Sequence, residues 1–416
     1  MNMVTLEQQL AHELAVLDRA GLKRFLRTIS SAQGTCVSSE GRQFINFSSN
    51  DYLGLANHPE LNQAAQAAIA AFGTGAGASR LISGSNAWFP KLETTLALYK
   101  GTERALAFSS GYAATLGTLP CLVTKGDVIL ADRLAHASII DAARLSGATL
   151  RVFRHNDLGH LQKLLRWAAT ELQASRSKSP CSDANPRTLP TESRPRRILI
   201  ATESIFSMDG DTAPLMDIVA LKTDWNAFLF LDEAHATGLC GPQGKGWAHA
   251  CAVAEHVEVT MGTLGKACGS SGGFVCGTAT LIEFLINRAR TFLFSTAPLP
   301  ACAAAAQTAL ELMSSHEGDR RRAVLWDNIR LLSSALRYEK PSQSAIFPIL
   351  VGAEHRASRI SQALFEKGFL VPAIRYPTVA RGKARLRISL SADHTSEQIH
   401  FLVAALESAC ADTLSV

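Results

Sequence analysis

The sequence lacks several patterns that would assign it to a particular class of protein. Its nine cysteines form no CxxC pair, so we predict neither a zinc site nor a disulfide framework, and no bound metal. Unpaired thiols are typical of a reducing cytosol, where we expect this protein. No run of about 18 apolar residues occurs, which argues against a transmembrane helix. Residues 1–27 read as an amphipathic helix and lack the apolar core of a signal peptide.

Basic residues exceed acidic ones only slightly. The net charge is +5 and the pI about 8.7, and no stretch combines clustered basic residues with interleaved aromatic ones. The charge therefore favours solubility rather than nucleic-acid binding. What the sequence does contain is a large hydrophobic fraction, 47% of 416 residues, beside 19% charged residues. This composition is typical of a globular protein, and the length favours a large domain with a smaller one attached.

Apolar strand-like runs alternate with helix-like segments between about residues 100 and 280. Several of these runs are continuously apolar, as expected for strands that are buried on both faces. A helical pattern at 160–173 lies between two of them. The alternation predicts an α/β fold with a mostly parallel sheet wrapped by helices. The predicted strands are 104–110, 127–132, 149–155, 197–203, 226–235, 257–266 and 272–278.

Two changes in composition divide the chain. Residues 174–197 are rich in Ser, Pro and Arg and poor in apolar residues, so we expect a mobile surface insertion in the large domain. After residue 296, helix-like sequence precedes strand candidates at 344–352 and 384–390, which predicts a smaller α+β domain. The expected parts are an N-terminal helix and short segment at 1–50, a large domain at 51–295 and a small domain at 296–416.

Asp232 and His235 directly follow an apolar strand candidate. In open α/β sheets, ligands bind at the carboxyl ends of the strands. A buried carboxylate there needs a partner. The ring nitrogen of pyridoxal phosphate (PLP) would be such a partner, kept protonated by Asp232, and His235 could then bond the phenolic oxygen of the ring. An aspartate that caps the next helix explains the same spacing.

Lys266 ends the next strand candidate and is followed by small residues up to Gly273. Such a setting can desolvate an amine, which lowers its pKa, and a Schiff base forms from the neutral amine. Thr263 lies three residues upstream, where its hydroxyl is placed to contact a phosphate. A surface lysine in a glycine-rich turn is the alternative, and the presence of Asp232 upstream argues against it.

Three further segments with candidate residues follow predicted strands. Gly111 and Tyr112 open a helical pattern, where glycine allows close approach and free N–H groups bind phosphate, although a plain strand-to-helix turn fits too. Ser207 could reach the phenolic oxygen of the cofactor. His136 could stack on the cofactor ring, whereas a structural role is the default for any one of the twelve histidines.

Together these segments resemble the α-oxoamine synthases, which are PLP enzymes of the aspartate-aminotransferase fold, also called fold type I. The resemblance runs from about Asn46 to Ser391, and its segments occur in one order. They are NFSSNDYLGL (46–55), GTGAGASRLISG (73–84), SSGYAA (109–114), ADRLAHAS (131–138), ESIFSMDGD (203–211), DEAHATG (232–238), TLGKACG (263–269) and FSTAPLP (294–300).

The resemblance implies roles by position. Lys266 would form the Schiff base with PLP and move the substrate proton. Asp232 would pair with the ring nitrogen, and His136 would stack on the ring and contact substrate. Ser207 and His235 would contact the phenolic oxygen.

The phosphate group of the cofactor would be held by the backbone of Gly111 and Tyr112 together with Thr263. Thr296 would reach the phosphate bound in the partner subunit. The resemblance therefore implies a homodimer with shared active sites.

The C-terminal stretch 373–390 resembles the family branch that acts in biotin biosynthesis. That branch joins L-alanine to a pimeloyl thioester of CoA or of acyl carrier protein, with loss of CO2. Arg375 would bind a carboxylate and Thr378 the acyl substrate. Asn50, and Arg24 in the N-terminal helix, would also contact substrate.

The sequence departs from the family pattern at Tyr376, which replaces a proline, and at Phe89, where many members carry a histidine nearby. Other members of the family remain alternatives, namely 2-amino-3-ketobutyrate CoA ligase, 5-aminolevulinate synthase and enzymes like serine palmitoyltransferase. A non-catalytic partner subunit is the alternative from another class. Such subunits lack the Schiff-base lysine, whereas Lys266 is present.

Overall fold

The computed structural model describes residues 4–176, 194–339 and 342–412, which form two compact units. Of the described residues, those within 58–206 and 212–319 form the larger unit, and those within 1–57, 207–211 and 320–416 form the smaller unit. The limits that we expected, at residues 50 and 295, follow the chain in order, whereas these units interleave along it.

Helix α11 (Pro300–Ser314) illustrates the difference from the expected limits, because it belongs to the larger unit. It packs against α2 (Pro59–Phe72) and α3 (Trp88–Lys100) of the same unit. Small buried side chains, including Ala304 and Ala306, allow this close packing.

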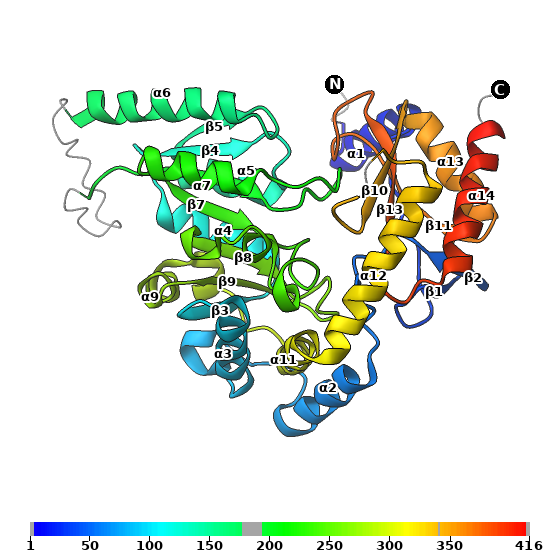
Figure 1. Ribbon diagram of the computed structural model, residues 1–416, viewed down its shortest axis with the longest axis horizontal. Coiled ribbons are helices and arrows are strands. Elements are labelled where there is room, and N and C mark those ends of the chain that lie inside the picture. Colours follow the sequence, from blue (N-terminus) through cyan, green and yellow to red (C-terminus); the bar gives the residue numbers. More distant parts are fainter. Residues whose placement is uncertain (1–3, 177–193, 340–341, 413–416) are drawn as a thin grey trace. The chain divides into compact units, whose positions relative to one another are not determined.

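The larger unit is built on a seven-stranded sheet in the order β3-β9-β8-β7-β6-β4-β5 (Figure 1). The strands from β8 to β5 in this order run parallel, and β9 runs antiparallel to both of its neighbours. The prediction of a mostly parallel sheet is therefore confirmed. The strands are β3 (Arg104–Phe108), β4 (Val128–Asp132), β5 (Thr149–Phe153), β6 (Ile198–Glu203), β7 (Phe228–Asp232), β8 (Val259–Thr263) and β9 (Gly273–Gly277).

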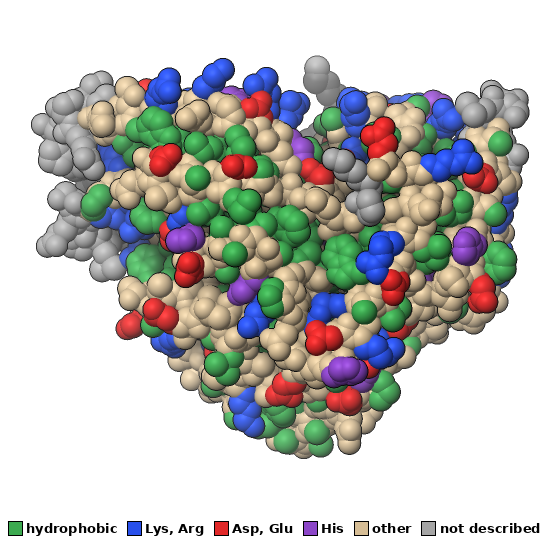
Figure 2. Space-filling model, in the orientation of Figure 1, with side chains coloured by type: hydrophobic (Ala, Val, Ile, Leu, Met, Phe, Trp, Pro, Cys, Tyr) green, Lys and Arg blue, Asp and Glu red, His purple; other side chains and the backbone are tan. Residues whose placement is uncertain are grey.

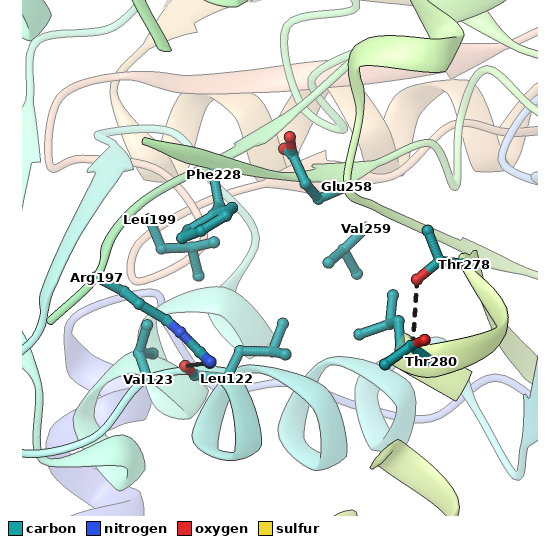
Figure 3. A pocket seen from close by; sticks show the side chains of 10 residues that line it. Leu122, Val123, Arg197, Leu199, Phe228, Glu258, Val259, Thr278 and Thr280 are labelled. Carbon is teal, nitrogen blue, oxygen red and sulfur yellow. Dashed lines mark hydrogen bonds between the residues drawn. The ribbon is translucent and has the colours of Figure 1, made fainter. Parts of the chain in front are cut away.

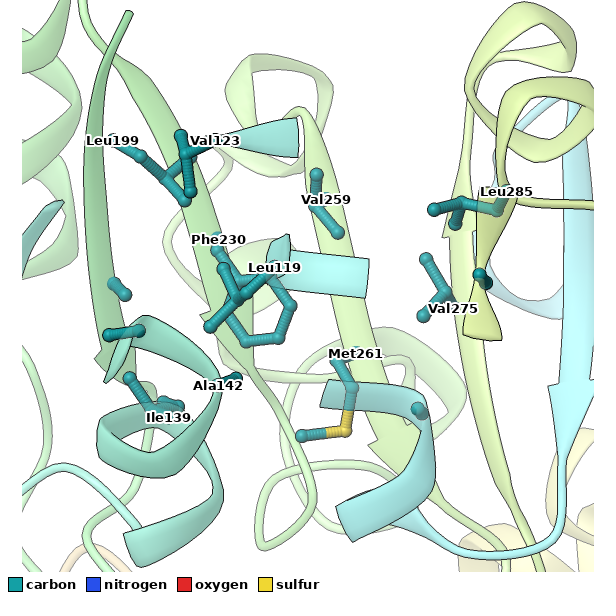
Figure 4. Packing of buried hydrophobic residues seen from close by; sticks show 14 of the residues in the cluster. Leu119, Val123, Ile139, Ala142, Leu199, Phe230, Val259, Met261, Val275 and Leu285 are labelled. Carbon is teal, nitrogen blue, oxygen red and sulfur yellow. The ribbon is translucent and has the colours of Figure 1, made fainter. Parts of the chain in front are cut away.

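Alternate residues of the central strands enter two different hydrophobic cores. In β6, Leu199 belongs to one core and Ile200 to the other, and in β7 Phe230 and Leu231 divide in the same way. Figure 4 shows the first core, where Leu119 lies beside Phe230 and Leu285 faces Val275. Burial of each large apolar side chain contributes about 1.5–3 kcal/mol. Because both faces are buried, the residues of these strands are mainly apolar.

Helices cover both faces of this sheet. The first core receives α4 (Gly111–Leu122), α5 (Ala137–Ser146), α9 (Ala279–Arg288) and α10 (Arg290–Leu293). The second core receives α6 (Leu158–Arg176), α7 (Leu215–Asp224) and α8 (Trp247–Ala250). Leu161, Leu165 and Ala168 of α6 recur at helical spacing and are buried. Lys and Arg side chains gather on the outer side of the unit where α6 lies (Figure 2).

The smaller unit contains two three-stranded sheets, in the orders β1-β2-β11 and β10-β13-β12. Its mixture of antiparallel pairs with helices confirms the α+β character that we predicted for the C-terminal part. The elements are α1 (Leu6–Arg19), β1 (Cys36–Ser39), β2 (Arg42–Asn46), β10 (Ile346–Gly352), α13 (Glu354–Glu366), β11 (Phe369–Leu370), β12 (Ala373–Ile374), β13 (Ala384–Ser389) and α14 (Ser396–Asp412). Most of α12 (His316–Ala335) also belongs to this unit.

The N-terminal helix α1 ends earlier than we predicted. It stops at Arg19, and Gly21 follows with a φ of 65°. In this left-handed conformation the Leu22 N–H donates to the Leu17 carbonyl oxygen at 2.8 Å, which closes the helix. The placement of Arg24 within the helix was therefore wrong, because the glycine ends the helix before it.

The sequence analysis also made predictions about membrane-spanning helices and about an insertion at 174–197. Within the described ranges, no helix combines the length and apolar character needed to cross a membrane. The predicted insertion at 174–197 falls largely on residues 177–193, which lie outside the described residues. Its first residues, 174–176, complete helix α6.

Candidate active site

Three polar residues end neighbouring parallel strands of the larger unit. Glu203 ends β6, Asp232 ends β7 and Thr263 ends β8. Glu203 and Asp232 are register partners across the β6–β7 pair. Because ligands of open α/β sheets bind at the carboxyl ends of the strands, this edge is where a site is expected.

A cavity of about 170 Å³ lies at this edge. Every predicted cofactor residue of the larger unit except Thr296 lines it. These residues are Gly111, Tyr112, His136, Asp232, His235, Thr263 and Lys266. The structure thus brings together residues from distant parts of the sequence. Gly111 and Lys266, for example, are 155 positions apart.

Lys266 and His235 are in direct contact in this cavity. The Nζ atom of Lys266 lies 2.7 Å from Nε2 of His235. Both residues follow strand ends, Lys266 after β8 and His235 after β7, so adjacent strands set this distance. At hydrogen-bond length, the two nitrogens can share one proton.

Asp232 is a buried carboxyl group with only 5% of its surface exposed. One oxygen, Oδ1, accepts a hydrogen bond from the Ala234 N–H at 2.8 Å. Burial raises the pKa of the Asp232 carboxyl, while the nearby Lys266 and His136 act in the opposite direction. A carboxylate in this position is charged at low cost only when a cation faces it.

The turn between Asp232 and His235 is held by a buried ion pair. Lys100 Nζ lies 2.8 Å from Glu233 Oε2, and each side chain is 1% exposed. Lys100 also donates to Thr237 Oγ1 at 2.8 Å and to the Lys245 carbonyl oxygen at 2.6 Å. The second oxygen of Glu233 accepts from the Ala248 N–H. Our sequence analysis missed Lys100, because nothing in its own segment indicates a distant acidic partner.

The N-terminus of α4 points at the same cavity. Ser110 caps this helix by accepting a hydrogen bond from the Ala113 N–H. The first N–H groups of a helix have no acceptor within it, so those of Gly111 and Tyr112 are suited to a phosphate. Strand β9 passes close by, since a Cβ atom on Gly273 would lie 2.3 Å from the Ser110 carbonyl oxygen. Only glycine fits there.

Thr263 lies beside this helix terminus, but its hydroxyl group is already engaged. It donates to the Gly272 carbonyl oxygen at 2.9 Å and accepts from the Gly265 N–H at 3.2 Å. A hydroxyl group has a single proton. Donation to a phosphate would therefore replace the hydrogen bond to Gly272.

His136 forms another wall of the cavity. It caps α5, and its Nδ1 atom lies 2.8 Å from Ser138 Oγ. The Tyr112 ring lies edge-on to it, with the ring centroids 6.4 Å apart. Burial lowers the pKa of the His136 imidazole, and the charge of Asp232 opposes this effect. A neutral imidazole at the cavity wall is suited to stacking on a flat ligand.

Thr296 lies elsewhere in the larger unit. It forms an isolated β-bridge with Ser79 and does not line the cavity that contains Lys266. Its expected contact with a partner subunit therefore stays a prediction.

The remaining predicted residues belong to the smaller unit, where Arg387 connects two of them. Arg387 is 5% exposed and donates to Asn50 Oδ1 at 3.2 and 3.1 Å. Its Nε atom donates to the Ser207 carbonyl oxygen at 2.7 Å. Our sequence analysis missed Arg387 as a site residue, because we interpreted 384–390 only as a strand. The available signal was a charged residue in an otherwise buried strand.

Arg375 lies on a larger cavity of the smaller unit, of about 650 Å³, which Lys23 and Arg27 also line. Its guanidinium group donates to the carbonyl oxygens of Gly21 and Lys23. Burial and the charge of Arg24 lower the pKa of Arg375. Thr378 is exposed, and its N–H donates to the Arg375 carbonyl oxygen at 3.0 Å.

No group of three or more potential metal ligands gathers among the residues that the structure describes. The polar groups that line the Lys266 cavity include an amine, a carboxyl group, imidazoles and the N–H groups of a helix N-terminus. This set can hold a flat, phosphorylated carbonyl compound through its phosphate, its ring nitrogen and its carbonyl carbon.

Comparison with solved structures supports this interpretation. Serine palmitoyltransferase from S. paucimobilis, solved with a PLP-myriocin aldimine, is 27% identical with a TM-score of 0.87, covering 99% of this chain and 100% of that one. An 8-amino-7-oxononanoate synthase from Francisella tularensis is 28% identical with a TM-score of 0.70, covering 88% of this chain and 97% of that one.

Sequence comparison gives more similar relatives. The 8-amino-7-oxononanoate synthase of Geobacter sulfurreducens is 44% identical, with 96% of this chain and 97% of the relative covered. That of Herminiimonas arsenicoxydans is 42% identical, with 97% and 100% covered. The model of the family "Aminotransferase class I and II" matches residues 42–406. The chain therefore belongs to the class I and II aminotransferase family and, within it, to the 8-amino-7-oxononanoate synthases.

Proposed function

We propose that this protein is a PLP-dependent acyltransferase that condenses L-alanine with a pimeloyl thioester in biotin biosynthesis. The products are 8-amino-7-oxononanoate, CO2 and the free thiol of the carrier, which is CoA or acyl carrier protein. The observation that carries the proposal is the Lys266–His235–Asp232 cavity in a chain that is 40–44% identical to these synthases over nearly its full length.

The cavity fits PLP in three respects. Asp232 is a buried carboxyl group that needs a cation, and a protonated ring nitrogen is one. Lys266 directs its amine into the cavity. The N–H groups of Gly111 and Tyr112 lie at a helix N-terminus, where a phosphate binds. When bound, PLP accepts the electron pair that is left on the amino acid when a bond to its Cα is broken.

Each polar residue of the cavity would have its own role in the reaction. Lys266 would hold the cofactor through its amine, and the same amine would accept the Cα proton of alanine. His235 lies 2.7 Å from the Lys266 amine, close enough to exchange a proton with it, and the family resemblance would place it at the phenolic oxygen. Asp232 would keep the ring nitrogen of PLP protonated, and His136 would stack on the ring.

The family resemblance assigns the substrate contacts to a further set of residues. Arg375 and Arg387 are both candidates for the carboxylate of alanine, because a guanidinium group matches a carboxylate with two parallel hydrogen bonds. The buried Arg387 is held by Asn50 and the Ser207 backbone. Thr378 and Arg24 would contact the acyl substrate, and Ser207 the phenolic oxygen.

We also infer a homodimer in which Thr296 contributes to the site of the partner subunit, and a cytoplasmic location. The inferences rest on the family resemblance and on the unpaired cysteines. Size-exclusion chromatography with light scattering tests the dimer. Inactive Lys266 and Thr296 variants, mixed to form heterodimers, test the sharing of sites by restored activity.

A thiol-release assay tests the main proposal. Purified protein is incubated with alanine, glycine or serine and with acyl-CoAs of several lengths, and pimeloyl acyl carrier protein is compared with pimeloyl-CoA. We expect thiol release with alanine and a pimeloyl thioester. Preference for glycine with a short acyl group, or for serine with a long one, would instead assign the chain to another α-oxoamine synthase activity.

A further inference from the structure

A second pocket lies at the opposite ends of the strands that form the proposed active site. Its volume is about 380 Å³, and its lining includes Leu199, Phe228 and Val259, which stand at the starts of β6, β7 and β8. The same strands end at Glu203, Asp232 and Thr263. A five-residue strand spans roughly 13 Å, so this pocket is separate from the Lys266 cavity.

Apolar side chains dominate the lining of this pocket. Leu122 and Val123 come from the end of α4 and Leu281 from α9, and they surround the space together with the strand residues. Phe228 is 38% exposed although it is a large aromatic residue. Figure 3 shows Phe228, Leu199 and Val259 around one common space. An apolar space of this size suits a hydrocarbon chain.

One side of the pocket is cationic. The Arg197 guanidinium donates from Nη1 to the Leu122 carbonyl oxygen at 2.7 Å. Desolvation and the neighbouring Arg194 lower the pKa of Arg197, whereas the charge of Asp127 acts in the opposite direction. In the described part of the chain, no carboxylate lies within ion-pair distance of Arg197. Asp127, whose charge acts on Arg197, is instead paired with Arg194.

The acidic residue of the lining does not neutralise Arg197. Glu258 forms a short ion pair with Lys222, and its Oε2 atom accepts from the Leu229 N–H at 2.8 Å. Figure 3 shows its carboxylate turned away from Arg197. The uncompensated charge of the pocket is therefore positive and lies beside apolar walls.

We propose that this pocket binds an aliphatic monocarboxylate, with the hydrocarbon chain between Phe228, Val259 and Leu281 and the carboxylate on Arg197. The free N–H groups of Arg197 can form charge-assisted hydrogen bonds to the carboxylate, and its positive charge favours an anion. The site is independent of the proposed condensation reaction, because it shares no lining residue with the Lys266 cavity.

Binding of four small probes to the PLP-loaded protein tests the proposal. Octanoate carries both features, whereas octanol lacks the charge, octylammonium reverses it and acetate lacks the chain. We expect saturable binding of octanoate by isothermal titration calorimetry and a rise in the melting temperature that follows its concentration. Absence of octanoate binding, or equal binding of octanol and octylammonium, would overturn the assignment.

Variants locate the binding site. Arg197→Gln should weaken octanoate binding roughly ten- to a hundredfold, since it removes a charge-assisted hydrogen bond. Arg196→Gln, which removes the neighbouring and exposed charge, is the matched control and should change binding little. Thr280→Trp, at an exposed position of the lining, should block the pocket without disturbing the core.

A second comparison separates this pocket from the active site. Lys266→Ala should leave octanoate affinity unchanged, because the lysine lies at the far ends of the strands. Octanoate binding that is lost in Lys266→Ala, or retained in both Arg197→Gln and Thr280→Trp, would place the ligand elsewhere and refute the proposed site.

Discussion

The amine of Lys266 lies 2.7 Å from the imidazole nitrogen Nε2 of His235. The two residues are 31 positions apart and follow the ends of adjacent strands. This contact places a proton acceptor beside the one lysine that lines the proposed cofactor cavity. It also gives the cofactor assignment a direct chemical test.

Lys266→Ala should abolish the visible absorption band that we expect from the purified, PLP-loaded protein. Borohydride reduction should fix the cofactor on the tryptic peptide that contains Lys266, as measured by mass spectrometry. Lys163→Ala, on the exposed side of α6, is the control and should keep both signals. A wild-type protein that stays colourless with added PLP would contradict the assignment.

Asp232→Asn should fold and retain PLP but lose activity by at least roughly tenfold, because a neutral amide forms a weaker hydrogen bond to the ring nitrogen. Thiol release measures the activity, and absorbance with circular dichroism shows that cofactor and fold are retained. Near wild-type turnover would remove Asp232 from the proposed mechanism.

Lys100→Met should destabilise the larger unit by about 3–5 kcal/mol, because it leaves the charge of Glu233 buried without its partner. The double variant Lys100→Met/Glu233→Gln should recover part of this loss. Urea unfolding measures both. Arg330→Ala breaks an exposed pair with Asp327 and should cost at most about 1 kcal/mol. Equal losses of stability in Lys100→Met and Arg330→Ala would contradict the conclusion that burial makes the Lys100–Glu233 pair the more important one.

Arg387→Lys and Arg375→Lys test which guanidinium binds the carboxylate of alanine. Each lysine keeps the charge but loses the planar pair of donors, so the affinity for alanine should fall roughly tenfold or more where the carboxylate binds. Spectral titration of the PLP-loaded variants with alanine gives the dissociation constants. If the substitution of one arginine leaves the affinity for alanine unchanged, that arginine does not bind the carboxylate of alanine. Its role is then structural, through the hydrogen bonds that it donates to backbone carbonyl oxygens.

His394 should make the smaller unit less stable at low pH. Burial lowers its pKa from the ordinary 6.5 to about 4, and its Nδ1 atom accepts from the Ser391 N–H at 2.9 Å. Since the unfolded chain binds the proton more tightly, stability is present above about pH 6.5 and falls between pH 6.5 and 4. The difference amounts to about 3 kcal/mol.

Urea unfolding across this pH range measures the effect of His394. His394→Gln should lower stability at pH 7 and flatten the pH dependence, whereas His400→Gln, at an exposed position of α14, should leave it unchanged. An unaltered slope in His394→Gln would exclude this histidine as the cause.

Local sequence patterns were sufficient to predict the seven strands of the larger unit and the cavity residues that follow them. A strand that is buried on both faces is mainly apolar, so a charged residue after an apolar run marks its end, as at Asp232. The segments that resemble the family then supplied the expected chemistry of Lys266, His136 and Gly111. These features depend on residues that are close together in the chain.

The tertiary structure decided what depends on residues far apart. Arg387 meets the Ser207 backbone across 180 positions, and Lys100 meets Glu233 across 133. Neither partner is marked in its own segment, because one charged residue in a strand or helix has many acceptable neighbours. The pocket at Arg197 likewise exists only where the starts of three strands meet two helices. A buried charge depends on a specific set of hydrogen-bond partners, and only the packing of the whole chain determines which residues these are.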